Sequence, residues 1–251
     1  MKKRMATAFL GVLMLLSCIM PVMAAESQEM NDEDFDMAVA EAMRDYDFDP
    51  EGTKDALAEL DATLIGEPTK VEYSTNIDEG VSLMSTLPSN YNLEVYSIKR
   101  GNTSDYRLQW RLDCNKTETL PGDLDYVSIE WDTARASFNK FTSDSKYTSV
   151  KSRSTGIVLF NVEDANMTAG TWTIGTVYVT PIKSGTMRFG SKFTHTYKET
   201  SSTGTASVSF GSSAESQNSL KLSYTVTYTV TTTNYMRSWE VWKETAVSMH
   251  L

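Results

Sequence analysis

The stretch DYRLQWRLD, Asp105–Asp113, alternates apolar and polar side chains without a fault. One parity holds Tyr106, Leu108, Trp110 and Leu112, and the other holds Arg107, Gln109, Arg111 and Asp113. Successive side chains of a β-strand point to opposite faces, so this alternation predicts a strand with its apolar side in and its polar side out.

Eight further segments are rich in Val, Ile, Thr, Tyr and Trp and are separated by Gly, Asn, Asp, Ser and Pro, a pattern typical of strands and turns. The nine predicted strands cover residues 91–99, 105–113, 125–132, 155–164, 170–180, 185–199, 203–210, 219–234 and 236–244. No long helical pattern lies between them, which excludes a parallel α/β fold. The sequence therefore predicts a mostly β protein, with an antiparallel β-sandwich of about nine strands over residues 91–251.

The last third of the chain is unusually rich in hydroxyl side chains, because 21 of the 43 residues from Ser191 to Thr233 are Ser or Thr. Its strands read as a meander with turns in ETSSTG and GSSAESQNS. In SLKLSYTVTYTVTTTN, Ser219–Asn234, one parity is apolar and the other is mostly hydroxyl-bearing. The apolar residues are Leu220, Leu222, Tyr224, Val226, Tyr228 and Val230.

Two environments fit this pattern. In a soluble sandwich the apolar face packs on a second sheet and the hydroxyl face meets water. In a membrane hairpin the apolar face meets lipid, and Leu220–Thr231 is long enough to span a bilayer. Strands of this kind resemble the insertion segments of β-pore-forming toxins, which implies a membrane-active strand. Residues 191–233 are therefore also a candidate membrane-active element.

The N-terminus predicts export. Three basic residues precede an apolar run from Ala6 to about Val22, and small residues follow at Ala24 and Ala25, as in a secretory signal peptide over residues 1–25. An alternative is a lipoprotein anchored through Cys18 of the LLSC stretch. Cutting after Ala25 leaves Cys114 as the one cysteine, which we expect to be a buried small hydrophobe. A secreted chain without disulfides fits a Gram-positive bacterium.

Charge divides the chain into two parts. Residues 26–94 carry 19 acids and three bases, a net charge of −16, whereas residues 95–251 have a net charge of +3. The acidic part is also helical in pattern, so residues 26–90 are predicted to be an acidic helical region and a possible pro-segment. We expect one helix over 31–46, capped by Asn31 or Asp32, and a second over 53–66, capped by Thr53. Both are short, so they either pack on the β domain or fray.

Motifs for metal, cofactor or catalysis are absent. The acidic stretch DYDFDPEGTKDA has Pro and Ala where a calcium-binding EF-hand loop needs Gly and Glu. Acids at strand ends, such as Glu130, Asp132, Glu163 and Asp164, are more often turn formers than glycosidase pairs. His195 is expected to be a hydrogen-bonded histidine of the core or rim. The chain is therefore expected not to be an enzyme and to need no cofactor.

Binding is the remaining function class. An acidic mature chain disfavours nucleic acid as a partner. The five tryptophans could provide a stacking platform for a sugar. Trp239 and Trp242, in the stretch SWEVWK, have opposite parity, so at least one is a candidate ligand-binding side chain. The leading hypothesis is a secreted bacterial binding or surface-interaction protein whose partner is a cell-surface glycan or protein. The alternative is a membrane-active, bacteriocin-like or toxin-like protein that acts on lipid.

Overall fold

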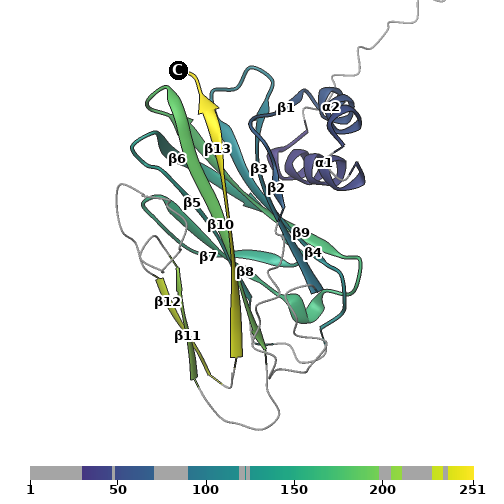
Figure 1. The fold of residues 1–251 in the computed structure, drawn as a ribbon, viewed down its shortest axis with the longest axis vertical. Helices are drawn as coiled ribbons and strands as arrows, with labels where there is room; N and C mark the ends of the chain where they lie inside the picture. Colours follow the sequence, from purple (N-terminus) through teal and green to yellow (C-terminus); the bar gives the residue numbers. More distant parts are fainter. Residues whose placement is uncertain are drawn as a thin grey trace, which may run out of the picture. The chain divides into compact units, whose positions relative to one another are not determined.

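A computed structural model describes residues 30–46, 49–70, 90–118, 122, 125–197, 205–210, 228–233 and 237–251. The predicted signal peptide and Cys18 lie outside the described residues. Two larger antiparallel sheets, a two-stranded ribbon and two α-helices make up the fold (Figure 1). The predicted fold class, an antiparallel β-sandwich preceded by a short acidic helical region, is confirmed.

One sheet has six strands in the order β1-β3-β4-β9-β6, with β2 also pairing with β3. The other has five strands in the order β13-β10-β5-β8-β7. The first sheet consists of β1 Ala62–Leu64, β2 Thr69–Lys70, β3 Tyr91–Arg100, β4 Tyr106–Cys114, β9 Trp172–Pro181 and β6 Ala136–Ser143. The second consists of β13 Arg237–Met249, β10 Gly185–Tyr197, β5 Asp125–Trp131, β8 Ile157–Val162 and β7 Thr148–Ser154.

The core lies between the two sheets and has the parity that the sequence predicts. Tyr106, Leu108, Trp110 and Leu112 of β4 are at most 2% exposed. They pack in one cluster with apolar residues of β5, β8 and β10, including Ile129, Phe160, Phe189 and Phe193. Because β4 lies between β3 and β9, this clearly alternating strand is also an inner strand of its sheet.

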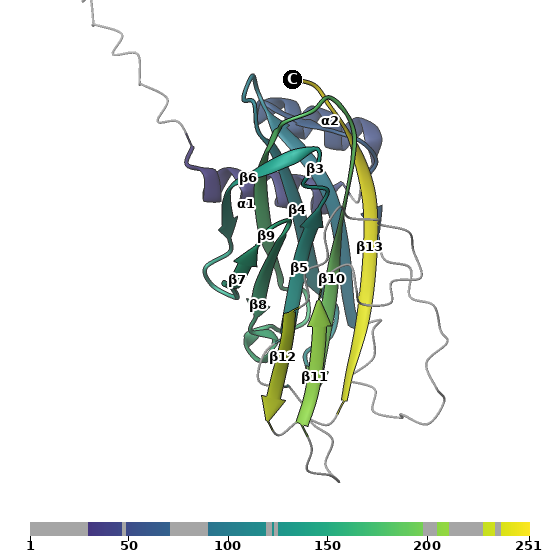
Figure 2. The same cartoon turned by 90° about the vertical axis from the view of Figure 1, so that its left-hand side faces the viewer.

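The predicted meander over residues 191–233 is wrong in its first pairing and confirmed in its second. β10 has β13 on one side and β5 on the other, and its register with β13 runs from Gly185↔Met249 to Tyr197↔Arg237. β11, Thr205–Phe210, does not join β10 but pairs with β12, Tyr228–Thr233, as the meander predicts, in a separate two-stranded ribbon (Figure 2). Local alternation does not say which strand is the neighbour, and the later β13 is the one that pairs with β10. The two predicted turns of the meander lie outside the described residues.

Two helices precede the sandwich. α1, Asp32–Asp45, begins after Asn31, whose side chain accepts a hydrogen bond from the Asp34 amide, as predicted. α2, Pro50–Glu59, differs from the prediction at both ends. Its cap is Asp49 rather than Thr53, because Pro50 suits the first helical turn and Asp49 accepts a bond from Gly52. The helix stops at Glu59, and residues 62–64 form β1 instead.

The nine predicted strands are all represented, and four others were not predicted. β1 and β2 are very short. β6 and β7 have a register shift each, between Phe138 and Lys140 and between Val150 and Ser152. An extra residue in a strand breaks the period of two, so alternation cannot reveal such a strand. Among the described residues, no helix combines the length and apolar character needed to cross a membrane.

Candidate functional site

The outer face of the six-stranded sheet is covered by α1. Every fourth residue of the helix contacts every second residue of β4. These are Asp32, Asp36, Ala40 and Arg44 on α1, and Arg107, Gln109, Arg111 and Asp113 on β4. Four helical residues rise about 6 Å and two strand residues about 6.7 Å, so the two spacings nearly match. The polar side of β4, predicted to face outward, is therefore buried beneath a helix.

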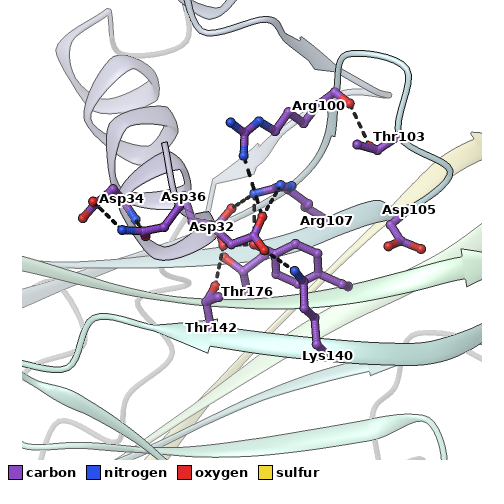
Figure 3. Close-up of polar contacts among 12 residues, drawn as sticks. Asp32, Asp34, Asp36, Arg100, Thr103, Asp105, Arg107, Lys140, Thr142 and Thr176 are labelled. Atoms are coloured by element: carbon purple, nitrogen blue, oxygen red, sulfur yellow. Dashed lines mark hydrogen bonds and ion pairs between the residues drawn. The ribbon is translucent and has the colours of Figure 1, made fainter. Parts of the chain in front are cut away.

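Charge along the helix complements charge along the strand. Arg107 lies 2.6 Å from Asp36 and 2.8 Å from Asp32 (Figure 3). Arg44, at the other end of α1, lies 3.8 Å from Asp113. Tyr178 on β9 also donates a hydrogen bond of 2.6 Å to Asp36. The acids at the start of α1 thus meet arginine, and its terminal arginine meets an acid.

Asp36 is the centre of this contact. Burial raises its pKa, although Arg107, Thr142 and Tyr178 each favour the ionised carboxylate. For Asp32, partial burial also raises the pKa, but contacts with Lys140 and Arg107 outweigh it and the net pKa is lowered. The pKa values of these two carboxyl groups, which lie on one face of the helix, are therefore shifted in opposite directions, upward for Asp36 and downward for Asp32.

The helix is an integral layer of the fold. Phe35, Val39 and Met43 are at most 1% exposed and pack with Tyr96 and Ile98 of β3. Burying each such side chain stabilises by about 1.5–3 kcal/mol, so these three alone contribute roughly 5–9 kcal/mol. The sequence left open whether the acidic helices pack on the β domain or fray, and in the structure α1 packs on it. The face beneath α1 is consequently not open to a ligand.

The open side of the sandwich lies where the sheets end in β6 and β7. The register shift in β6 places Phe138 and Phe141 opposite the inward-facing Val179 and Val177. Their rings lie 6.3 Å apart, and Phe138 also stacks on the buried Trp131. Phe141 remains 41% exposed, which is unusual for a large apolar side chain in this fold.

A cavity of about 470 Å³ opens at this edge. The Phe138 ring is its aromatic wall, with the fully buried Trp131 stacked behind it, and Arg153 of β7 lies 4.4 Å above the Phe138 ring. The other lining residues are small and mostly hydroxyl-bearing: Thr133, Ala136, Ser137, Ser154, Thr155 and Gly156. We call this cavity the Phe138 pocket. Its size falls in the range of about 300–1,000 Å³ usual for small-molecule sites.

The β7 strand makes this edge basic. Lys151 and Arg153 are exposed and form no ion pair with a described residue. Lys146 is also exposed and lies 4.6 Å from the Tyr147 ring. Charged side chains and bulges also protect sheet edges from pairing with other chains. The aromatic wall and enclosed volume are the features that edge protection does not require.

A second cavity, of about 500 Å³, lies between α2 and β1. Leu57, Ala58, Ala62 and Leu64 contribute to its lining, with Lys54 and Glu67 as its charged members. It has no aromatic wall, so it offers fewer specific contacts than the Phe138 pocket.

A separate cluster of titratable groups is buried at the end of the sandwich. His195 Nδ1 lies 2.7 Å from Asp125 Oδ2 and 3.7 Å from Asp164 Oδ2, and its Nε2 lies 3.4 Å from Glu118 Oε2. Burial alone lowers the pKa of His195, but the three carboxylates outweigh it and raise the pKa to about 10. Tyr91 OH lies 3.4 Å from Asp164 Oδ2. As expected, His195 is a hydrogen-bonded core histidine.

The predicted ligand-binding residues lie on β13. The backbone of Trp239 pairs with His195 and that of Trp242 pairs with Lys192, while their side chains lie outside the described residues. The two tryptophans are thus on the edge strand next to β10, at the other end of this sheet from β7. Trp110 and Trp131 are fully buried and belong to the core, so neither provides a surface platform.

The predicted membrane-active strand is described only in part. Tyr228 and Val230 belong to β12 and pair with Phe210 and Val208 of β11. Leu220, Leu222, Tyr224 and Val226 lie outside the described residues.

Two other sequence expectations concern single residues. Cys114 is 1% exposed, as predicted for a buried small hydrophobe, and burial raises the pKa of its thiol to about 11. Asp132 and Glu163 accept hydrogen bonds within their own turns, from the Ala134 amide and from Asn166. Both acids therefore act as turn formers, the role expected for acids at strand ends.

No protein family matches the chain, and no curated protein sequence matches it. Among solved structures, the sixth cohesin of scaffoldin B from Acetivibrio cellulolyticus, in complex with a dockerin, is 10% identical. The match covers 38% of this chain and 77% of the cohesin at a TM-score of 0.30. The membrane-inserted NetB toxin of Clostridium perfringens is 5% identical over 74% of this chain and 96% of the toxin, with a TM-score of 0.32.

The pilus backbone protein RrgB of Streptococcus pneumoniae is 14% identical over 59% of this chain and 44% of that protein, with a TM-score of 0.27. These neighbours are bacterial proteins rich in β-structure. Similarity at this level is too low to transfer a ligand or an activity to this chain.

Proposed function

We propose that this chain is a secreted bacterial binding protein, not an enzyme, that recognises an anionic cell-surface glycan at the β6–β7 edge. The observation that carries this proposal is the Phe138 pocket, in which an arginine without an ion pair among the described residues lies above an aromatic ring. An aromatic face packs against the apolar face of a sugar ring. The guanidinium pairs with a carboxylate or phosphate on that sugar.

Neighbouring groups support this assignment. The hydroxyls of Ser137, Thr133 and Thr155 line the same cavity and can bond sugar hydroxyls. Lys151, two residues before Arg153, adds positive charge along β7. Nearby charge of one sign raises the association rate for a polymer of the opposite sign.

The test is binding to an anionic polymer, polygalacturonate, with neutral dextran as the matched uncharged probe. We expect binding to polygalacturonate alone. Arg153→Gln removes a charge-assisted hydrogen bond of about 1.5–3 kcal/mol, so it should weaken binding roughly tenfold to a hundredfold. Lys54→Gln, on α2, also removes one positive charge and should leave binding unchanged. Equal effects of the two substitutions would show that charge alone, rather than the pocket, drives binding.

A second candidate function rests on the β11–β12 ribbon. Its register pairs like with like: Val208 with Val230 and Phe210 with Tyr228, but Ser207 with Thr231 and Ser209 with Thr229. An amphipathic ribbon of this kind suits a membrane surface. Dye release from anionic liposomes tests this function, and Val230→Asp should abolish the release. If the unaltered protein releases no dye, the membrane candidate is removed and the glycan proposal stands unaffected.

A further inference from the structure

Carboxylates from three other elements of the fold converge on His195. His195 belongs to β10, Asp125 begins β5, Asp164 lies in a short 3-10 helix at Asp164–Asn166, and Glu118 follows β4. Their residues are at most 8% exposed, and the side chains of His195, Asp125 and Glu118 are fully buried. Buried ionisable groups of this density need a counter-charge.

Among the described residues, carboxylates outnumber cations in this cluster. Asp125, Asp164 and Glu118 are its three carboxylates, and the charge of His195 acts on both Asp125 and Asp164. With all three carboxylates ionised and the imidazole protonated, these four groups carry a net charge of −2. A carboxylate in a dry interior is costly unless a proton or a cation neutralises it.

The geometry suits a shared cation. His195 Nδ1 and one oxygen each of Asp125 and Asp164 lie within 4.8 Å of one another. Nδ1 lies 2.7 Å from the Asp125 oxygen and 3.7 Å from the Asp164 oxygen, so an ion at the metal–ligand distances of about 2.0 to 2.6 Å usual in proteins can contact all three atoms. In addition, Asp164 Oδ1 is buried and has no hydrogen-bond partner among the described residues. That oxygen is available to a second coordination position.

Glu118 lies where it can accept a hydrogen bond from the imidazole nitrogen that would not bind the metal. Its Oε2 lies 3.4 Å from His195 Nε2, on the side of the ring away from Asp125 and Asp164. A metal-ligating imidazole usually donates its other N–H to a carboxylate, which fixes the orientation of the ring. Thr196 and Tyr91 hold the inner carboxylates in the same way, by donating to Asp125 and Asp164.

We propose that His195 Nδ1, Asp125 and Asp164 bind a divalent transition-metal ion, with Glu118 orienting the imidazole. One imidazole nitrogen with carboxylates suits Mn²⁺ or Zn²⁺, whereas Ca²⁺ and Mg²⁺ prefer oxygen ligands alone. The ion would connect β5 and β10 with the segment that follows β8. It therefore stabilises the fold at one end of the sandwich and is independent of the Phe138 pocket.

The test uses the full-length protein, stripped with a chelator and then supplied with Mn²⁺ or Zn²⁺ alone. We expect about one ion per chain by elemental analysis. At a hundredfold excess over Kd, the melting temperature should rise by about 5–10 °C. Ca²⁺ and Mg²⁺ at the same concentration should give little or no rise. Absence of a stoichiometric ion together with an unchanged melting temperature would overturn the proposal, because the cluster would then be neutralised by protons.

A matched pair of variants separates this site from surface acids. Asp164→Asn keeps the side-chain shape and should lose the ion, whereas Asp55→Asn, an exposed acid on α2, should keep it. Co²⁺ provides a second readout, since its visible absorption depends on the ligands. The unaltered protein should give the bands of a nitrogen- and oxygen-ligated site. If Asp164→Asn does not fold, the metal content and the Co²⁺ spectrum of the unaltered protein decide the matter. If Co²⁺ added to the protein gives only the spectrum of hydrated Co²⁺, the site is refuted.

Discussion

Arg107→Met should be among the most destabilising single substitutions on the outer face of the six-stranded sheet. The Arg107 side chain is 5% exposed, pairs with Asp36 and Asp32, and lies 4.2 Å from the Phe35 ring and 4.6 Å from the Tyr178 ring. Its removal leaves the Asp36 carboxylate, itself 2% exposed, without a full counter-charge. Breaking a buried pair in this way costs about 3–5 kcal/mol.

The loss should depend on pH with a definite sign. In the variant, Asp36 can avoid an unpaired buried charge only by binding a proton. Its pKa is already raised above the ordinary value, so removing Arg107 raises it further. A folded pKa above the unfolded one means that stability falls as pH rises through that interval. Arg107→Met should therefore lose more stability at pH 8 than at pH 5.

The assay is urea unfolding followed by tryptophan fluorescence, for which the buried Trp110 on β4 is a suitable reporter. Arg44→Met is the control, because the Arg44 side chain is 41% exposed and lies 3.8 Å from Asp113, so its removal should cost about 1 kcal/mol or less. The double variant Asp36→Leu/Arg107→Met should recover part of the loss, since it removes both charges of the buried pair. A loss below 1 kcal/mol for Arg107→Met, or no recovery in the double variant, would refute a charge-matched contact.

Three other predictions concern single residues. Gly175→Ala should destabilise by about 1–3 kcal/mol in urea unfolding, because an added Cβ would lie 2.6 Å from Trp110 Nε1; unchanged stability would show that the indole can move aside. The thiol of Cys114, buried and with a pKa raised to about 11, should not react with a thiol reagent at pH 8 until urea unfolds the chain, and rapid reaction of the folded protein would contradict its burial. Asp32→Asn should be less stable than the unaltered protein at pH 7, because Lys140 and Arg107 stabilise the ionised Asp32 carboxylate and so lower its pKa. The difference in stability should vanish as pH falls below the ordinary Asp pKa of 3.8 and Asp32 becomes protonated. A difference that persists at pH 2 would argue against this cause.

The sequence predicts the inner strands well because their constraint is local. The alternation around Trp110 follows from packing between two sheets, so the residue type at each position of β4 indicates whether its side chain faces the core. The cap at Asn31 is local too. The α2 start was missed because Thr53 and Asp49 are both good caps, and the choice depends on Pro50.

The candidate sites depend on contacts that a single strand does not contain. Phe138 and Phe141 are three apart, so strict alternation would place them on opposite faces, and the bulge in β6 brings them together. The group around His195 joins residues up to 77 positions apart, from Glu118 to His195. Its members carry no motif spacing. A charged strand face beneath a charged helix is likewise visible only once the two elements are paired.

The pairing of β10 with β13 determines when the fold can be completed. β13 follows every other described strand, yet it pairs with β10 along all thirteen residues of β10. Until β13 is in place, β10 has β5 as a partner on one side and an open row of amides and carbonyls on the other. A chain that stops before residue 237 should therefore aggregate, and complete chains should gain protease resistance only late, once β13 has paired with β10.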